Sequence, residues 1–324
     1  MRFPGLRGNL LLALASSLLT LVLFVVGYET WQTIRYRAWR ARYDNKGWLG
    51  TLTVPSSDPV LMWEYRPHGN HRGIETNRYG FRDEDFESPR KPEGVWRVAF
   101  VGDSVTLGLG VAPDQTFERL CVKEAAVLAP ALRLQALNFG IDGYNTEQVA
   151  ELVRTRVPAF EPDRVVYVMC LNDFDRTDSS AEKIRYFRRP RSFLLDDLRV
   201  LYRRLRGIEF HRYHYERNGA ATLDEIVAMK ESVAARSGFL VAILPVFFEG
   251  RHDFASYPLR DIHEAVRAFC EKNGIVAVDL LPAFERAGGD AAGYALDPWH
   301  LSIAGHQLVA RELTPQLLKA APAR

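Results

Sequence analysis

The sequence predicts an α/β protein with a parallel five-stranded sheet, preceded by one N-terminal transmembrane helix. Apolar, β-rich runs alternate with helical patterns over most of the chain, and an uncharged apolar run lies near the N-terminus. The 324 residues are 47% hydrophobic and 25% charged with a formal net charge of +2, which is typical of a globular protein. These values argue against a disordered chain, a coiled coil and a multi-span membrane protein, and near neutrality argues against a dedicated nucleic-acid binder.

The N-terminal element is a candidate membrane anchor. Residues 10–27 are 18 residues without a charge, preceded by Arg2 and Arg7, and this is the lower length limit for a membrane-spanning helix. A cleaved signal peptide is the alternative, but its apolar region is usually about 7 to 15 residues long. No A-x-A-like cleavage site follows the run, which leads directly into Tyr28, Glu29 and Trp31. We therefore expect residues 1–47 to form an uncleaved anchor with a basic juxtamembrane segment.

Two patterns disagree on which side of the membrane the soluble part lies. The basic residues that follow the apolar run outnumber those that precede it. The residues that follow are Arg35, Arg37, Arg40, Arg42 and Lys46. Taken alone, the positive-inside rule would place the soluble domain in the cytoplasm. A short N-terminal tail before one long apolar run is instead typical of a signal anchor that exports the domain on its C-terminal side. We expect the soluble part on the exported side, in the periplasm or outside the cell.

The soluble part begins with a preamble at residues 48–94, where repeated Pro and Gly predict a loop-rich segment. Five apolar runs then predict buried strands at residues 96–101, 132–138, 164–170, 239–244 and 275–279. Helical patterns alternate with them near residues 116–128, 146–156, 223–236, 259–272 and 302–318. This alternation predicts a parallel sheet covered on both faces, in which functional residues lie just after the carboxyl ends of the strands.

Four polar motifs lie where these predicted elements end or begin. GDSV at residues 102–105 comes after the first strand and places a serine at a tight strand exit, a suitable position for a nucleophile. NFGIDGYNT at 138–146 and CLND at 170–173 come after the next two strands, and DPWH at 297–300 precedes the last helix. Each motif alone is typical of turns and helix caps. Their occurrence together, in this order, indicates a common site.

The ordered set resembles the SGNH hydrolase superfamily, also called GDSL esterases and lipases, over roughly residues 95–315. The resemblance implies a flavodoxin-like three-layer α/β/α fold, hydrolysis or transfer of acyl esters, and an exported catalytic domain. The third motif of the family usually begins with glycine, whereas this sequence has Cys170 there. That departure bears on the local backbone geometry and not on the asparagine two residues later.

The resemblance assigns a role to five residues. Ser104 is the nucleophile, with Asp297 and His300 completing the triad, and the oxyanion hole comprises the backbone of Ser104 and Gly143 with the side chain of Asn172. The residue types suit these roles, because a serine hydroxyl needs a neighbouring base and histidine can accept its proton near neutral pH. A carboxylate three residues before the histidine can orient the imidazole, and three N–H donors can stabilise the oxyanion.

Other polar residues receive a structural interpretation. His306 in the last predicted helix is interpreted as a capping or packing histidine, since no carboxylate precedes it at triad spacing. Asp103 and Asp173 are interpreted as turn and cap residues, because neither belongs to a cluster of metal ligands. The three cysteines lack metal or redox spacing and are predicted to be buried free thiols: Cys121, Cys170 and Cys270. We predict no cofactor and no metal.

Residues 174–222 are predicted to be an insertion in a hydrolase domain that spans 95–324, because the chain there is longer than the predicted elements need. Residues 183–217 contain eleven Lys+Arg and four Asp+Glu, a local net charge of +7. Within them, Ser192 and Gly207 delimit a predicted amphipathic helix with leucines on one face. We favour a surface helix packed on the domain. The alternative is a lid or membrane-surface element that meets phospholipid headgroups or an anionic glycan through Tyr186, Phe187, Tyr213 and Tyr215.

These observations predict a membrane-anchored serine ester hydrolase that removes O-acyl groups, O-acetyl foremost, from envelope carbohydrate or lipid through an acyl-serine intermediate. An O-acyltransferase that uses the same triad on an envelope polysaccharide is the first alternative, since the two differ only in the acceptor that reaches the acyl-enzyme. A catalytically inactive glycan-binding protein is the second, which the presence of all five motif residues disfavours. The predicted partners are an acyl-ester substrate and the membrane, with no nucleic acid.

Overall fold

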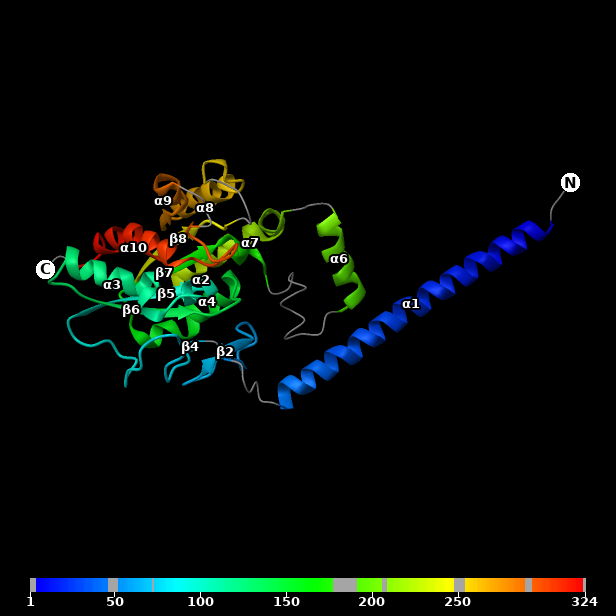
Figure 1. The fold of residues 1–324 in the computed structure, drawn as a ribbon, viewed down its shortest axis with the longest axis horizontal. Coiled ribbons are helices and arrows are strands. Elements are labelled where there is room, and N and C mark those ends of the chain that lie inside the picture. Colours follow the sequence, from blue (N-terminus) through cyan, green and yellow to red (C-terminus); the bar gives the residue numbers. More distant parts are fainter. Residues whose placement is uncertain are drawn as a thin grey trace. The chain divides into compact units, whose positions relative to one another are not determined.

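The computed structural model describes residues 4–45, 52–71, 73–176, 191–205, 209–247, 254–288 and 293–322. The chain divides into two compact units. The helical unit comprises Met1–Leu49 and Ser180–Glu209, and the sheet unit comprises Gly50–Ser179 and Phe210–Arg324. Figure 1 shows the elements of both.

The sheet unit is built on a five-stranded parallel sheet with strand order β6-β5-β7-β8-β9. The strands are β5 Val95–Gly102, β6 Arg133–Gly140, β7 Arg164–Cys170, β8 Gly238–Leu244 and β9 Val276–Asp279. All five predicted strands are confirmed, with boundaries that differ by at most two residues. The order is that of a flavodoxin-like sheet, in which ligands bind beyond the carboxyl ends of the strands where the order reverses. In this chain the reversal lies between β5 and β7.

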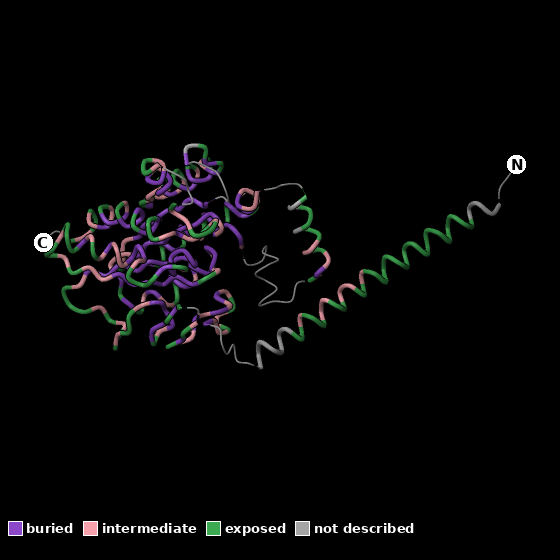
Figure 2. The backbone as a smooth tube through the Cα atoms, in the orientation of Figure 1, coloured by how far each residue is buried: buried purple, intermediate pink, exposed green. Residues whose placement is uncertain are grey.

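Both faces of the sheet are covered, since every residue of β5, β7 and β8 after the first is buried, as the purple segments of Figure 2 show. Among the described residues, the helices of this unit are α2 Ser104–Leu107, α3 Phe117–Leu128, α4 Thr146–Thr155, α7 Phe210–Val233, α8 Arg260–Lys272, α9 Leu281–Ala287 and α10 Ile303–Leu318. Short 3₁₀ turns lie at η1 Pro113–Gln115, η2 Val157–Phe160, η3 Leu171–Phe174 and η4 Phe254–Ser256. The three cysteines are free and buried, as predicted.

Helix α7 begins at Phe210, well before the predicted start at residue 223. Its first turns contain His211 and His214, which are 5% and 2% exposed although both are polar. Burial of these turns stabilises a helix that their sequence pattern does not indicate. Tyr213 and Tyr215 therefore belong to the sheet unit, where the ring of Tyr215 packs on Phe174 with a centroid separation of 5.1 Å. Tyr186 and Phe187 lie outside the described residues.

The preamble forms two short antiparallel hairpins, β1 Thr53–Pro55 with β2 Trp63–Tyr65 and β3 Asn70–His71 with β4 Ile74–Glu75. The segment after β4 covers the free edge of β6, where the backbone N–H of Asn138 donates to Asp83 Oδ2 at 3.0 Å. Arg82, 6% exposed, donates to the carbonyl oxygens of Leu107 and Gly108 at the end of α2. The preamble is thus packed against the elements that surround the predicted nucleophile.

The helical unit contains α1 Pro4–Asn45 and α6 Phe193–Leu205. Within α1, Gly8–Ala38 is long and apolar enough to cross a membrane, with an 18-residue window of mean hydropathy 2.6, and that window is 0% buried. Figure 2 shows this exposure along α1. Helix α6 matches the amphipathic helix predicted after Ser192, whose Oγ accepts from the backbone N–H of Leu195 at 3.2 Å, as expected of an N-cap.

Candidate active site

The nucleophile position is a tight turn from β5 into α2. Ser104 is the first residue of α2 and is 7% exposed, and the preceding Asp103 caps the helix by accepting from the backbone N–H of Val105 at 2.8 Å. Gly102 closes the turn. A Cβ at this position would lie 2.8 Å from the carbonyl oxygen of Val168 on the neighbouring strand, so the turn requires glycine.

The DPWH turn brings its histidine onto this serine. His300 Nε2 lies 2.9 Å from Ser104 Oγ, and its Nδ1 lies 2.6 Å from Asp297 Oδ2. The other carboxylate oxygen of Asp297 accepts from the backbone N–H groups of Trp299 and His300, each at 2.9 Å. The structure therefore joins hydroxyl, imidazole and carboxylate in one chain of hydrogen bonds.

The surroundings of Asp297 keep its carboxylate ionised, as is needed to orient the imidazole of His300. Partial burial alone would raise its pKa, but the hydrogen bonds from the ring of His300 and from the backbone of His300 and Trp299 hold the pKa of Asp297 below its usual range. The carboxylate therefore remains ionised at neutral and mildly acidic pH. An ionised Asp297 holds the proton of His300 on Nδ1 and leaves Nε2 as the acceptor for the serine hydroxyl.

The predicted oxyanion donors lie around the same turn. Gly143 has φ = +78°, a left-handed conformation that favours glycine, and its loop runs beside the nucleophile turn because Ile141 N–H donates to Gly102 O at 3.1 Å. Asn172, in η3 after β7, donates from Nδ2 to Asp103 Oδ2 at 2.9 Å. A carboxylate can only accept here, so Asp103 determines which end of the amide faces it and leaves the second N–H of Nδ2 for another acceptor.

The departure at Cys170 causes no backbone conflict. Its φ of −104° and ψ of 151° are extended values that any residue adopts, so this position does not need the glycine usual in the family motif. The backbone N–H of Cys170 donates to Asp173 Oδ2 at 3.1 Å, and Tyr167 Oη donates to the same oxygen at 2.8 Å. Asp173 is thus a cap, as predicted, and holds the turn that carries Asn172.

The preamble contributes residues to the candidate site that the sequence motifs do not indicate. Tyr65 Oη accepts from the backbone N–H of Asp142 at 2.7 Å, and Trp63 Nε1 donates to Asp142 O at 3.3 Å. Tyr144 Oη in turn donates to the carbonyl oxygen of Trp63. These bonds hold the residues on both sides of Gly143. The alternation of Trp63 and Tyr65 in β2 indicates a half-buried strand, but no local pattern indicates that these side chains bond to the loop around Gly143.

The remaining polar candidates have structural partners. His306 Nδ1 accepts from the backbone N–H of Phe117 at 3.1 Å and so caps α3, in agreement with the predicted capping role. Burial, together with the positive charge of Arg82, lowers the pKa of His306 to about 3, which keeps the ring neutral as an acceptor. Among the described residues, no group of three or more His, Cys, Asp or Glu side chains is placed to hold a metal ion.

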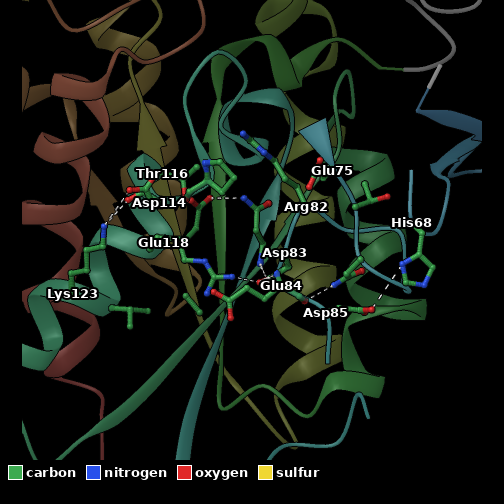
Figure 3. A pocket seen from close by; sticks show the side chains of 17 residues that line it. His68, Glu75, Arg82, Asp83, Glu84, Asp85, Asp114, Thr116, Glu118 and Lys123 are labelled. Atoms are coloured by element: carbon green, nitrogen blue, oxygen red, sulfur yellow. Dashed lines mark hydrogen bonds and ion pairs between the residues drawn. The ribbon is translucent and has the colours of Figure 1, made fainter. Parts of the chain in front are cut away.

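A cavity of about 600 Å³ lies at the edge of β6, between the preamble and α3 (Figure 3). Its lining includes Asp83, Glu118 and Asn138 and none of the five residues assigned to the site. Glu118 is 1% exposed, and burial raises its pKa to about 8. Its Oε1 accepts from Asn138 Nδ2 at 3.4 Å, while Oε2 has no hydrogen-bond partner among the described residues. Glu118 is therefore protonated at neutral pH in the folded protein.

This buried acid predicts a pH-dependent stability. Between pH 4.5 and about 8 the unfolded chain releases the proton of Glu118 while the folded protein retains it, so stability falls as the pH rises, by about 1.4 kcal/mol per pH unit for one group. We expect Glu118→Gln to remove this slope and to raise the urea midpoint at pH 8 more than at pH 5. Glu271→Gln, at a carboxylate 80% exposed, is the control. Equal pH profiles for wild type and Glu118→Gln would contradict the assignment.

Comparisons with known proteins identify the family. The model of the GDSL-like Lipase/Acylhydrolase family matches residues 100–308. No curated protein matches the sequence.

Similar solved structures include LAE5, an alpha/beta hydrolase enzyme from the metagenome of Lake Arreo, Spain, at 22% identity over 70% of this chain and 96% of that one, with a TM-score of 0.47. Axe2, an acetylxylan esterase from Geobacillus stearothermophilus, is 19% identical over 70% and 97% of the chains, with a TM-score of 0.47. TesA is 15% identical over 69% and 99%, with a TM-score of 0.47. Because the family model spans more than half of the sequence, the chain belongs to the GDSL-like lipase/acylhydrolase family and is a serine carboxylic ester hydrolase.

Proposed function

We propose that the chain is a membrane-anchored hydrolase in which Ser104 is the nucleophile, His300 the general base and Asp297 the residue that orients the base. The observation that carries this proposal is the continuous chain of hydrogen bonds, 2.9 Å from Ser104 Oγ to His300 Nε2 and 2.6 Å from His300 Nδ1 to Asp297. Hydrogen-bond contact between nucleophile and base, with the base held by a third group, is the arrangement that activates a serine.

The proposed reaction has two steps. Ser104 Oγ attacks the ester carbonyl carbon while His300 Nε2 takes the hydroxyl proton, and the resulting oxyanion accepts from the backbone N–H groups of Ser104 and Gly143 and from the second N–H of Asn172 Nδ2. The tetrahedral intermediate then expels the alcohol, which His300 protonates, and leaves an acyl-serine. In the second step His300 deprotonates water as it attacks the acyl carbon. The second tetrahedral intermediate then collapses while His300 returns the proton to Ser104 Oγ, which releases the acid and restores the serine.

The proposed substrates are O-acyl esters, O-acetyl esters foremost, on envelope carbohydrate or lipid. Beside the proposed base, Trp299 is 39% exposed, and its indole N–H donates to His211 Nε2 at 3.4 Å. Leu296 and Ile303, which flank the DPWH turn, are 53% and 44% exposed. A fixed indole face with apolar neighbours offers a contact surface for a sugar ring or an acyl chain next to the ester.

The anchor in this proposal is α1, with the sheet unit on the exported side. Helix α1 is continuous from Pro4 to Asn45, and its apolar part is exposed and long enough to cross a bilayer. Sedimentation with membranes after an alkaline carbonate wash tests the anchor. Cleavage of the sheet unit by external protease in intact spheroplasts tests the exported side, and protection in intact but not in lysed spheroplasts would contradict it.

A substrate panel with product analysis tests the activity. We expect the full-length protein in mild detergent to release p-nitrophenol faster from the acetate than from longer acyl esters, and to release free acetate from an acetylated oligosaccharide. In this panel p-nitrophenyl octanoate represents a lipid-like substrate. Faster turnover of the octanoate than of the acetate would contradict the proposed preference for O-acetyl esters. Transfer of the acetyl group to an added sugar hydroxyl in place of water would instead identify an O-acyltransferase.

The role of Asn172 is tested by Asn172→Ala. Removal of one oxyanion donor is expected to lower kcat by about 100 to 1,000-fold with little change in KM, because the donor acts mainly in the transition state. Asn218→Ala is the control, since Asn218 Nδ2 donates to Phe174 O at 2.8 Å and supports the same 3₁₀ turn from outside the site. A loss in Asn218→Ala equal to that in Asn172→Ala would show that the effect is structural.

The bracing of the Gly143 loop is tested by Tyr65→Phe. Loss of the hydroxyl removes the acceptor of the Asp142 N–H, a hydrogen bond worth about 0.5 to 1.5 kcal/mol, and loosens the loop. We expect kcat for a soluble ester to fall about tenfold, the equivalent of about 1.4 kcal/mol. Tyr79→Phe, which removes a hydroxyl that donates to Glu87 O elsewhere in the preamble, is expected to retain full activity. An unchanged kcat with lowered stability would limit Tyr65 to a folding role.

A further inference from the structure

Helix α6 carries an apolar leucine stripe that no other described residue covers. Leu195, Leu198, Leu201, Tyr202 and Leu205 are between 49% and 77% exposed. At 100° per residue these five positions occupy an arc of about 120° on one side of the helix. Five large apolar side chains on one exposed face are far more than the scattered exposed leucine that any protein surface shows.

Residues of α6 outside the leucine stripe contact α1. Glu29 accepts from Ser192 Oγ at 2.6 Å and from the backbone N–H groups of Phe193 and Leu194 at 3.1 and 3.0 Å, so a carboxylate of α1 caps α6. Asp197 accepts hydrogen bonds from the side chains of Tyr28 and Gln32. At 100° per residue Phe193 and Asp197 lie 80° and 40° from Leu201, outside the arc of the leucine stripe, and these contacts leave the stripe exposed.

The contacts place α6 at the end of the apolar run of α1. Asp197, in the middle of α6, bonds to Tyr28, the first residue after the uncharged residues 10–27, while Phe193 packs against Tyr36 at a centroid distance of 6.1 Å. With a rise of 1.5 Å per residue, α6 thus meets α1 within about 14 Å of the end of that run. Tyr28 and Trp31 at this level are residues typical of the membrane–water interface.

The charge of the segment also suits a lipid surface. Residues 183–217 carry a net charge of +7, in a chain whose total is +2. Arg199, 70% exposed, lies on the polar side of α6 beside the stripe. Helix α6 itself holds three Arg and two Asp, a net charge of +1, so most of this positive charge lies in the sequence on either side of the helix. An amphipathic helix flanked by basic residues is the type that lies in the plane of a bilayer containing anionic lipids.

We propose that α6 is an in-plane membrane helix, whose leucine stripe inserts at the boundary between headgroups and acyl chains of the bilayer that α1 spans. The proposal rests on the anchor given under the proposed function and adds a second membrane contact to it. Because only residues 206–209 join α6 to α7 of the sheet unit, this contact ties the catalytic unit to the lipid surface through both the anchor and the insertion. The enzyme would then act on esters in or beside the headgroup layer.

The test uses single cysteines in the full-length protein. Leu201→Cys places a fluorophore on the stripe, and Arg199→Cys places one on the adjoining polar side, 200° around the helix from position 201. The three native cysteines are buried, so labelling of the unsubstituted protein provides the background. Both labelled variants are reconstituted in vesicles of phosphatidylethanolamine and phosphatidylglycerol, and retained ester turnover shows that each is folded.

We expect the emission of the probe at position 201 to shift to the blue and to be quenched by nitroxides attached to acyl chains near the headgroup. The probe at position 199 should be quenched by aqueous iodide. Iodide quenching of position 201 in a protein that still sediments with vesicles would overturn the proposal and leave the anchor intact. Protection of position 201 from both iodide and lipid nitroxides would also overturn it, by showing that protein covers the stripe. Failure to sediment after the carbonate wash would contradict the anchor itself and, with it, this inference.

Discussion

Ser104→Ala is expected to lower kcat/KM for p-nitrophenyl acetate by about 10⁴ to 10⁶-fold. The substitution removes the only atom that can form the acyl-enzyme in the proposed reaction, and only the modest acceleration due to binding and the oxyanion donors is left. Alanine differs from serine only by the loss of Oγ, so it fits the buried position of Ser104 without a clash, and the substitution removes only the hydrogen bond to His300. Initial rates with the full-length protein in detergent measure the effect.

The matched control is Ser232→Ala. The hydroxyl of Ser232 donates to the carbonyl oxygen of Met229 at 2.8 Å on α7, so this variant loses a serine and a hydrogen bond outside the proposed site. We expect it to retain wild-type turnover. If Ser104→Ala retained more than about one hundredth of the wild-type rate while folded, the assignment of the nucleophile would be wrong.

His300→Ala is expected to cause a loss of similar size, about 10⁴-fold or more, because Ser104 then has no base to accept its proton. The two residues act as one unit. The double variant Ser104→Ala, His300→Ala is therefore expected to be no worse than either single variant. A second measurement, the rate at which an organophosphonate modifies Ser104, reports the nucleophilicity of the serine apart from substrate binding and should fall with loss of His300.

His68→Ala is the control for this variant, because the side chain of His68 is 64% exposed in the preamble and lies outside the site. It should leave both ester turnover and phosphonate labelling unchanged. Additive losses in the double variant, or normal labelling of Ser104 in His300→Ala, would contradict the proposed role of His300 as base.

Local sequence patterns determined most of the sheet unit. The five strands lie within two residues of their predicted positions and α3, α4, α8 and α10 within one, because apolar periodicity and turn residues act over a few neighbouring positions. The start of α7 was missed, since its buried histidines have no apolar pattern and are stabilised by tertiary packing.

The four motifs were recognisable for a related reason. In a parallel sheet the carboxyl ends of the strands meet at one edge, so residues after successive strands lie together wherever they are in the chain.

Only the tertiary structure decided which groups bond across long separations in the sequence. The brace of Tyr65 on Asp142, the bond from Asn172 to Asp103, and the cap that Glu29 provides for α6 each join segments with no shared local pattern. Glu118 gives no sign in the sequence of its burial, which raises its pKa to about 8. The sequence by itself thus determined the elements and the candidate catalytic residues, because both depend on short-range pattern and strand order. The bracing of the site and the exposure of the leucine stripe depend on how distant segments pack. Only the folded chain specifies that packing.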